Sequence, residues 1–137
     1  SNVSINNEIV GKIDSGLVVF SCFTIDDTLD DINYIVKKVL NLRIFDDEKG
    51  IMNLSIKDIG GKILSISQFT LYADTKKGNR PSYASAMKGI DAIKLYEMFN
   101  TELKKEIEVE TGIFGSEMDV HIRNDGPVTI FIDSRVR

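Results

Sequence analysis

The chain is short of the residues that build most catalytic and metal centres. Its 137 residues include one histidine, one cysteine, two prolines and no tryptophan. One cysteine cannot form an internal disulfide, and one cysteine with one histidine is a poor start for a zinc site. Cys22 lies in an apolar stretch, which favours a small core residue over a nucleophile. His121 alternates with Val120 and Ile122, a pattern more typical of a structural or exposed histidine than of a catalytic one. We therefore expect no metal and no cofactor.

Several signals of location and chemistry are also missing. No apolar run approaches the roughly 20 residues that a membrane span needs. The opening SNVSINNEIV lacks the basic and apolar regions of a signal peptide. No glycine-rich phosphate loop or nucleophile elbow is present, and Asp119 and Asp133 are more typical of solvated carboxylates than of an acid–base pair. With a single cysteine, this predicts a cytoplasmic protein that does not enter a membrane.

The composition is that of an ordinary globular protein. Hydrophobic residues make up 42% of the chain and charged residues 28%, and the length predicts one domain over residues 1–137. The net charge is −4, which by itself disfavours a nucleic-acid partner because phosphate binding depends on Lys and Arg. However, Lys76, Lys77 and Arg80 lie within five residues of one another. Such a cluster is consistent with either a solvated loop or a phosphate-binding loop.

Alternation and turn residues predict more strands than helices. A helix is expected where Leu29, Ile32, Val36, Val39 and Leu40 recur at three- and four-residue steps, with Thr28 and Asp31 as a capping box. A second helix is expected along Ile90, Ile93, Tyr96, Phe99 and Leu103. The predicted strands are residues 3–5, 8–13, 17–23, 43–45, 62–72, 118–123 and 128–133. We predict an α+β fold with two main helices on a largely antiparallel bent sheet or partial barrel.

Two segments do not fit a purely structural interpretation. Gln68 and Thr70 lie in the C-terminal half of the predicted strand 62–72, where polar side chains need a partner or a purpose. The segment Asn124-Asp125-Gly126-Pro127 consists only of turn-forming residues and by itself indicates a hairpin turn. Taken together, SQFTLYADTKKGNRPSY (67–83) and NDGPVTIFIDS (124–134) resemble the two signature stretches of the D-aminoacyl-tRNA deacylases. NLRIF (41–45) also resembles that family, and the resemblance covers nearly the whole chain.

The resemblance implies a tRNA-editing hydrolase that acts as a homodimer. Such an enzyme cleaves the ester between a D-amino acid and the tRNA 3′ end. In the family the Gly-Pro bond, here Gly126–Pro127, is cis, and each subunit inserts this motif into the pocket of its partner. The carbonyls of Gly126 and Pro127 would then reject an L side chain, a form of chiral proofreading that selects by exclusion. Glycine has no side chain, so glycyl-tRNA mischarged on an alanine acceptor is an expected second substrate.

The resemblance also assigns roles on the opposite wall of the pocket. Backbone N–H groups around Phe69 and Thr70 would form an oxyanion hole, and Gln68 would bind near the terminal ribose. Ser67 would form part of the same pocket wall. The tRNA 2′-hydroxyl would help to activate the water, which explains the missing acid–base pair; a covalent role for Thr70 is the competing mechanism. Lys76, Lys77 and Arg80 become candidates for binding acceptor-stem phosphates.

Two questions stay open at this point. Family members usually begin with a further strand that carries a basic residue, ahead of the part that matches residues 1–5. Either the start of the sequence is incomplete, or the sheet lacks that strand and the pocket lacks a supporting residue. The same fold and basic loop could also belong to a nucleic-acid-binding module without turnover. Salt-dependent RNA binding without hydrolysis would distinguish that module from the enzyme.

Overall fold

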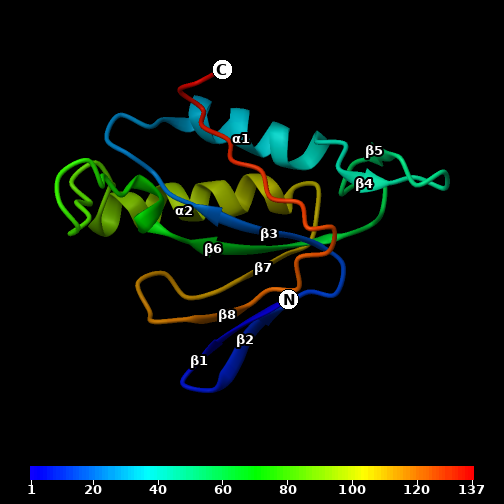
Figure 1. Cartoon of the computed structure of the whole chain (residues 1–137), viewed down its shortest axis with the longest axis horizontal. Helices are drawn as coiled ribbons and strands as arrows, with labels where there is room; N and C mark the ends of the chain where they lie inside the picture. Colours follow the sequence, from blue (N-terminus) through cyan, green and yellow to red (C-terminus); the bar gives the residue numbers. More distant parts are fainter.

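Two helices cover one face of a central sheet, and a second sheet covers the other face (Figure 1). The computed structural model describes all residues, 1–137. The elements in chain order are β1 (Asn2–Ile5), β2 (Glu8–Lys12), β3 (Gly16–Ser21), α1 (Leu29–Asn41), β4 (Phe45–Asp46), β5 (Met52–Leu54), β6 (Lys62–Ser67), the 3-10 turn η1 (Phe69–Tyr72), α2 (Gly89–Lys104), β7 (Val109–Thr111) and β8 (Asp119–His121). Neither helix has the length and apolar character to cross a membrane.

The strands form three separate sheets. The central sheet has the order β3-β6-β7 and is parallel, because α1 lies in the connection from β3 to β6 and α2 in the connection from β6 to β7. The second sheet, β2-β1-β8, and the small pair β4-β5 are antiparallel. The predicted α+β class is therefore confirmed, with antiparallel pairing in the two outer sheets and parallel pairing in the centre.

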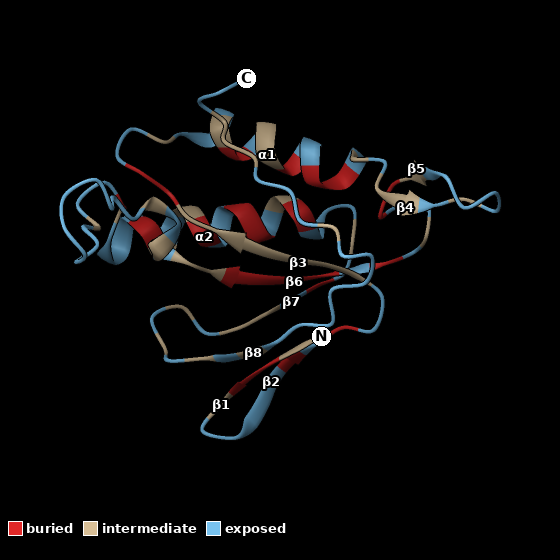
Figure 2. Ribbon diagram, in the orientation of Figure 1, coloured by how far each residue is buried: buried red, intermediate tan, exposed pale blue.

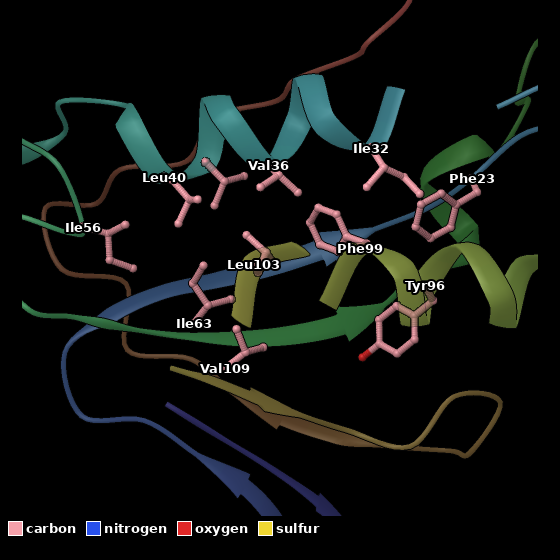
Figure 3. Packing of buried hydrophobic residues seen from close by; sticks show 11 residues of the cluster. Phe23, Ile32, Val36, Leu40, Ile56, Ile63, Tyr96, Phe99, Leu103 and Val109 are labelled. Atoms are coloured by element: carbon pink, nitrogen blue, oxygen red, sulfur yellow. The ribbon is translucent and has the colours of Figure 1, made fainter. Parts of the chain in front are cut away.

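The main core lies between the helices and the central sheet (Figure 3). In α1, Ile32, Val36, Val39 and Leu40 are buried, as predicted, but Leu29 at the start of the helix is 46% exposed. The buried face of α2 runs through Ala92, Tyr96, Phe99, Asn100 and Leu103. The prediction was wrong for Ile90, which is 69% exposed, because the buried stripe passes through Ala92 instead.

The start of α1 follows the predicted capping box. The Asp31 carboxylate accepts a hydrogen bond from the Thr28 N–H at 2.9 Å and one from the Thr28 hydroxyl at 3.3 Å. The first of these bonds is the main reason that the pKa of Asp31 lies below its ordinary value. Two residues only three positions apart in sequence thus determine where this helix begins.

Three of the predicted strands differ from the strands in the structure. The strand expected over residues 62–72 ends at Ser67, because the chain turns into η1, where the Leu71 N–H donates to the Gln68 carbonyl at 3.2 Å. The strand expected at residues 43–45 is only the short β4. Residues 128–133 were predicted as a strand but pair with no neighbouring strand, and Figure 2 shows the segment after β8 exposed over most of its length.

Truncating Leu103 should test the core directly. Leu103 is fully buried, so Leu103→Ala removes its packing and leaves a cavity, and the free energy of unfolding should fall by about 2–5 kcal/mol. Ile90→Ala on the same helix is the matched control and should change stability by less than about 0.5 kcal/mol. Urea unfolding followed by circular dichroism measures both. Equal effects of the two variants would contradict this placement of α2.

Candidate functional site

The candidate site is built where the central strand β6 ends. The parallel register of β3 and β6 runs to Ser21 and Ser67, and the Gln68 N–H still donates to the Ser21 carbonyl at 2.8 Å. The chain then turns into η1, so that Phe69 projects outward with 50% of its surface exposed. This turn places Ser67, Gln68, Phe69 and Thr70 together at the end of a buried strand. The sequence predicted these residues as a site but assigned them to the strand itself.

Two neighbouring backbone N–H groups have no hydrogen-bond partner within the protein. The N–H groups of Phe69 and Thr70 donate no hydrogen bond to any protein atom. They are the first donors of a 3-10 turn, a position at which helical donors have no internal acceptor. A pair of free donors on adjacent residues can stabilise a negatively charged oxygen.

The side chains beside these donors form a short polar pair. Gln68 Nε2 donates to Thr70 Oγ1 at 2.7 Å, and both residues are half-buried. No histidine, lysine or carboxylate makes a hydrogen bond to that hydroxyl. Thr70 therefore has an acceptor role in the structure and lacks the adjacent base that usually activates a hydroxyl nucleophile.

Two residues to which the sequence assigned no role in this site contact the turn. The Cys22 thiol donates to the Phe69 carbonyl at 3.4 Å, and burial raises the pKa of Cys22. A raised pKa keeps the thiol protonated, which suits a donor and not a nucleophile. The Phe69 ring packs edge-on against Tyr83, with centroids 5.0 Å apart. The sequence did not predict these contacts, because Cys22 and Tyr83 lie 47 and 14 positions from Phe69.

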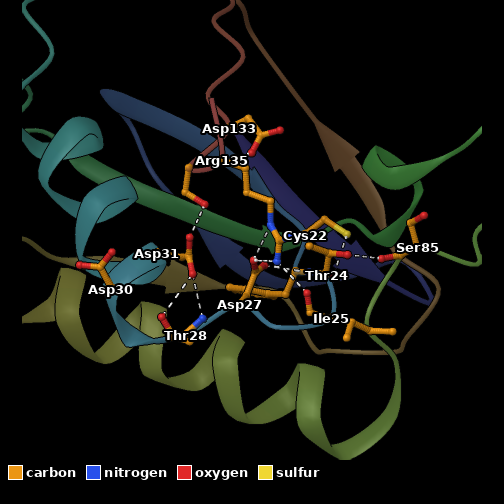
Figure 4. Close-up of polar contacts among 12 residues, drawn as sticks. Cys22, Thr24, Ile25, Asp27, Thr28, Asp30, Asp31, Ser85, Asp133 and Arg135 are labelled. Carbon is orange, nitrogen blue, oxygen red and sulfur yellow. Dashed lines mark hydrogen bonds and ion pairs between the residues drawn. The ribbon is translucent and has the colours of Figure 1, made fainter. Parts of the chain in front are cut away.

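A network of hydrogen bonds joins the C-terminal segment to the residues that follow β3 (Figure 4). Arg135 donates to Asp27 at 3.0 Å, and the Asp27 side chain is only 7% exposed. Asp27 also accepts the Thr24 N–H at 2.8 Å, and the Thr24 hydroxyl donates to the Ser85 carbonyl. The network thus connects residues that are 108 positions apart in sequence.

The second predicted segment forms an exposed loop after β8. The peptide bond between Gly126 and Pro127 is cis, and both residues are exposed. Within the loop, Asn124 Nδ2 donates to Thr129 Oγ1 at 2.9 Å, and the Val128 N–H donates to Asn124 Oδ1 at 3.1 Å. The two ends of the loop are therefore fastened to each other by side chains.

The structure does not bring the two segments together within one chain. The loop follows β8 close to the N-terminus, where the Arg123 N–H donates to Ser1 Oγ at 3.2 Å. The 67–70 segment lies at the other end of the central sheet, beyond the tips of β3 and β6 (Figure 1). No hydrogen bond joins the loop to Gln68 or Thr70.

The basic residues lie on a loop that directly follows η1. Asp74 and Ser82 close this loop with a pair of backbone hydrogen bonds of 2.8 and 2.9 Å. Lys76, Lys77 and Arg80 are exposed between them and form no ion pair. The three positive charges are therefore free to meet an anionic partner beside the candidate site.

The remaining polar candidates are structural or solvated. His121 is exposed on β8 and lies 3.2 Å from Asp119 on the same strand. The Asp133 side chain accepts the Arg135 N–H at 2.9 Å in a local turn. No group of three or more His, Cys, Asp or Glu side chains could hold a metal ion.

Comparison with known proteins gives a consistent result. A family model described as D-Tyr-tRNA(Tyr) deacylase matches residues 1–133. A Bacillus subtilis (strain 168) protein described as "Inactive D-aminoacyl-tRNA deacylase" is 57% identical over 131 residues, or 95% of this chain and 99% of the relative. A solved structure described as "c-Myc DNA Unwinding Element Binding Protein" is 38% identical with a TM-score of 0.89, over 94% of this chain and 89% of that one. A "probable eukaryotic D-amino acid tRNA deacylase" shares the fold at 18% identity and a TM-score of 0.72, over 86% and 85% of the two chains.

Proposed function

The chain belongs to the D-Tyr-tRNA(Tyr) deacylase family, and we propose that it hydrolyses the ester bond of D-aminoacyl-tRNA. The observation that carries the proposal is the pair of free N–H donors on Phe69 and Thr70, placed beside the Gln68 side chain at the end of β6. In ester hydrolysis the carbonyl oxygen becomes negatively charged in the transition state. A single preorganised donor to that oxygen is typically worth about 2.7–4 kcal/mol of the activation barrier.

The reaction we propose takes its proton chemistry from the RNA. No acidic or basic side chain forms a hydrogen bond with Thr70, so the chain itself places no base on this hydroxyl. The 2′-hydroxyl of the terminal adenosine adjoins the ester and can help to activate the attacking water. Gln68 would hold the terminal ribose, Phe69 would give apolar contact, and Ser67 and Thr70 would line the pocket.

Selectivity requires a second copy of the chain in this proposal. The exposed loop of residues 124–129 lies far from the 67–70 segment of its own chain, so a homodimer is the arrangement in which the two can meet. The carbonyls of Gly126 and Pro127 would then stand against the substrate α-carbon. A hydrogen fits there and an L side chain does not. D-aminoacyl esters are therefore substrates, as is glycyl-tRNA mischarged on an alanine acceptor.

Recognition of the tRNA would rely on charge next to the site. Lys76, Lys77 and Arg80 are exposed, unpaired and adjacent to η1, so an acceptor stem with its 3′ end at Phe69 would place phosphates near them. Binding should then weaken as salt rises, with a slope that reflects the number of phosphates neutralised. We place this activity in the cytoplasm, where aminoacyl-tRNA is used.

A second candidate function is nucleic-acid binding without turnover. It is favoured by the 57% identical relative described as inactive and by the name of the 38% identical structure, which refers to binding a DNA element. In this case the basic loop would remain functional while the ester would not be cleaved.

One experiment separates the two candidates. Purified protein is mixed with D-tyrosyl-tRNA, L-tyrosyl-tRNA and glycyl-tRNA on an alanine acceptor, and release of the amino acid is followed over time alongside RNA binding. Cleavage of the D and glycyl esters with the L ester spared supports the deacylase. Salt-dependent binding without cleavage of any ester supports the binding module.

Replacing Thr70 tests the mechanism from the protein side. If the RNA activates the water, Thr70→Ala should keep kcat within about tenfold of the parent, because the backbone donors remain and only one side-chain hydrogen bond is lost. Thr70→Val, which keeps the shape without the hydroxyl, is the control for pocket volume. Both are measured by single-turnover deacylation. Complete loss in both variants, with activity kept in Thr70→Ser, would establish the covalent role instead.

A further inference from the structure

Strand β6 loses one of its two neighbours just before the candidate site. On one edge, β3 stays paired with β6 as far as Ser67. On the other edge, the last pair with β7 joins Ser65 to Thr111, and β7 ends there. The final residues of β6 therefore have a strand beside them on one edge only. They lead directly into the turn that carries the free N–H groups of Phe69 and Thr70.

A side chain from α2 holds β6 at the point where β7 ends. The Ser65 carbonyl accepts a hydrogen bond of 3.4 Å from the Gly112 N–H, just beyond β7, and one of 2.8 Å from the Tyr96 hydroxyl. Hydrogen bonds from N–H groups usually span about 2.7–3.2 Å and those from hydroxyls about 2.5–3.0 Å, so only the Tyr96 bond has an ordinary length. Figure 3 shows Tyr96 reaching from α2 toward the central sheet.

Both partners of this bond are buried. Tyr96 is 5% exposed and belongs to the main core, where its ring packs against Phe114 with the centroids 5.7 Å apart. Ser65 is fully buried, and its own hydroxyl has no hydrogen-bond partner within the protein. Bulk water cannot replace a donor that is lost at such a carbonyl. Without the Tyr96 hydroxyl, this edge of β6 would keep only the long bond from Gly112.

The position of this bond along β6 gives it a consequence for the site. The N–H groups of Phe69 and Thr70 follow Ser65 by four and five residues, without another strand of β7 beside them. Donors stabilise an oxyanion only when they are held roughly 2.7–3.1 Å from it, and this oxyanion forms in the transition state. A loosened strand end should therefore slow turnover and leave ground-state binding of the tRNA unchanged.

We propose that Tyr96 is a positioning residue for the candidate site. Its hydroxyl fixes the β7 edge of β6 at Ser65 and thereby the placement of the Phe69 and Thr70 N–H groups. Tyr96 acts through the backbone of β6 and not by contact with the substrate. Its effect on catalysis rests on the proposed deacylase activity, whereas its anchoring of the turn does not.

Tyr96→Phe removes only the hydroxyl and keeps the ring in the core. With D-tyrosyl-tRNA, kcat should fall at least about tenfold, a part of the roughly 100-fold cost of misplacing a catalytic group by about 1 Å. KM should stay within about twofold. Tyr34→Phe on α1 is the matched control, because the Tyr34 hydroxyl forms no hydrogen bond within the protein, and it should change neither constant. An unchanged kcat in Tyr96→Phe, or a change in KM as large as that in kcat, would overturn the proposal.

Hydrogen exchange of the same variants tests the anchor without turnover. The Gln68 N–H donates to the Ser21 carbonyl at 2.8 Å and reports on the end of β6. The Ile63 N–H donates to the Glu108 carbonyl at 3.0 Å and reports on its start. In Tyr96→Phe, exchange should become at least about tenfold faster at Gln68 and stay the same at Ile63. Equal acceleration at both amides, or none at Gln68, would mean that the hydroxyl does not anchor the turn.

Phe114→Leu is a second variant that keeps the hydroxyl. It removes the ring that packs against Tyr96 and so loosens the same anchor indirectly. Exchange should again accelerate at Gln68 and not at Ile63, and this variant decides the question if Tyr96→Phe does not fold. A parent protein that cleaves no ester would refute the proposed deacylase activity, while the exchange rates would still show whether Tyr96 holds the end of β6.

Discussion

Removing the 2′-hydroxyl of the terminal adenosine should slow deacylation by roughly 10²–10⁴-fold, the range expected for losing a general acid–base group. The site explains why so much depends on one substrate group. Two backbone donors can stabilise the developing oxyanion, but no carboxylate, histidine or lysine is hydrogen-bonded to the Gln68–Thr70 pair to move a proton. The proton chemistry then falls to the nearest hydroxyl of the RNA.

The measurement uses a D-tyrosyl ester of a short acceptor-stem RNA with either ribose or 2′-deoxyribose at its end. Because the neighbouring hydroxyl also affects spontaneous hydrolysis, the rate without protein is subtracted for each substrate. A deoxyribose at the preceding nucleotide is the control for altered binding, and it should change kcat little. Undiminished kcat with the terminal deoxyribose would rule out the RNA-assisted mechanism and return attention to Thr70.

The features that sequence predicted well depend on neighbours in the chain. The start of α1 was predictable because Thr28 and Asp31 are three residues apart and their hydrogen bond is local. The β1–β2 hairpin was predictable because Asn6 and Asn7 both tolerate the positive φ of its turn, at 49° and 65°. The two candidate segments stand out as sequence patterns, and their placement at the end of β6 and after β8 follows from the strands that precede them.

The features that sequence missed depend on distant parts of the fold. Apolar alternation continues past Ser67, yet the strand ends there because the chain turns into η1 beyond the last residue of β3. Residues 128–133 have the pattern of a strand but no paired neighbour, and a pairing partner cannot be read from one segment. The contact of Arg135 with Asp27 spans 108 residues and has no local signature. Likewise, the free N–H groups of Phe69 and Thr70 become visible only when every backbone acceptor is known.

Gly126→Ala should lower kcat/KM for D-aminoacyl-tRNA on the order of 10²-fold, the cost of misplacing a pocket wall by about 1 Å. Gly126 has a φ of +125°, which L side chains rarely adopt, and an added Cβ would lie 2.9 Å from Val128 Cγ2 and 3.1 Å from the Val128 nitrogen. Relief of both contacts requires a shift of the backbone that carries the two carbonyls. If those carbonyls exclude L side chains, the ratio of D to L hydrolysis should fall together with the rate.

Gly115→Ala separates this local effect from general destabilisation. Gly115 also has a positive φ, +80°, but nothing lies within 4 Å of an added Cβ, so it has the backbone strain without the collision. Both variants are compared by thermal unfolding and by hydrolysis of matched D- and L-tyrosyl-tRNA. Loss of activity and selectivity in Gly126→Ala, with equal melting temperatures for the pair, places the effect in the exposed loop. An unchanged rate and an unchanged D to L ratio in Gly126→Ala would mean that the loop forms no wall of the pocket, and selectivity would then have to arise within the 67–70 segment alone.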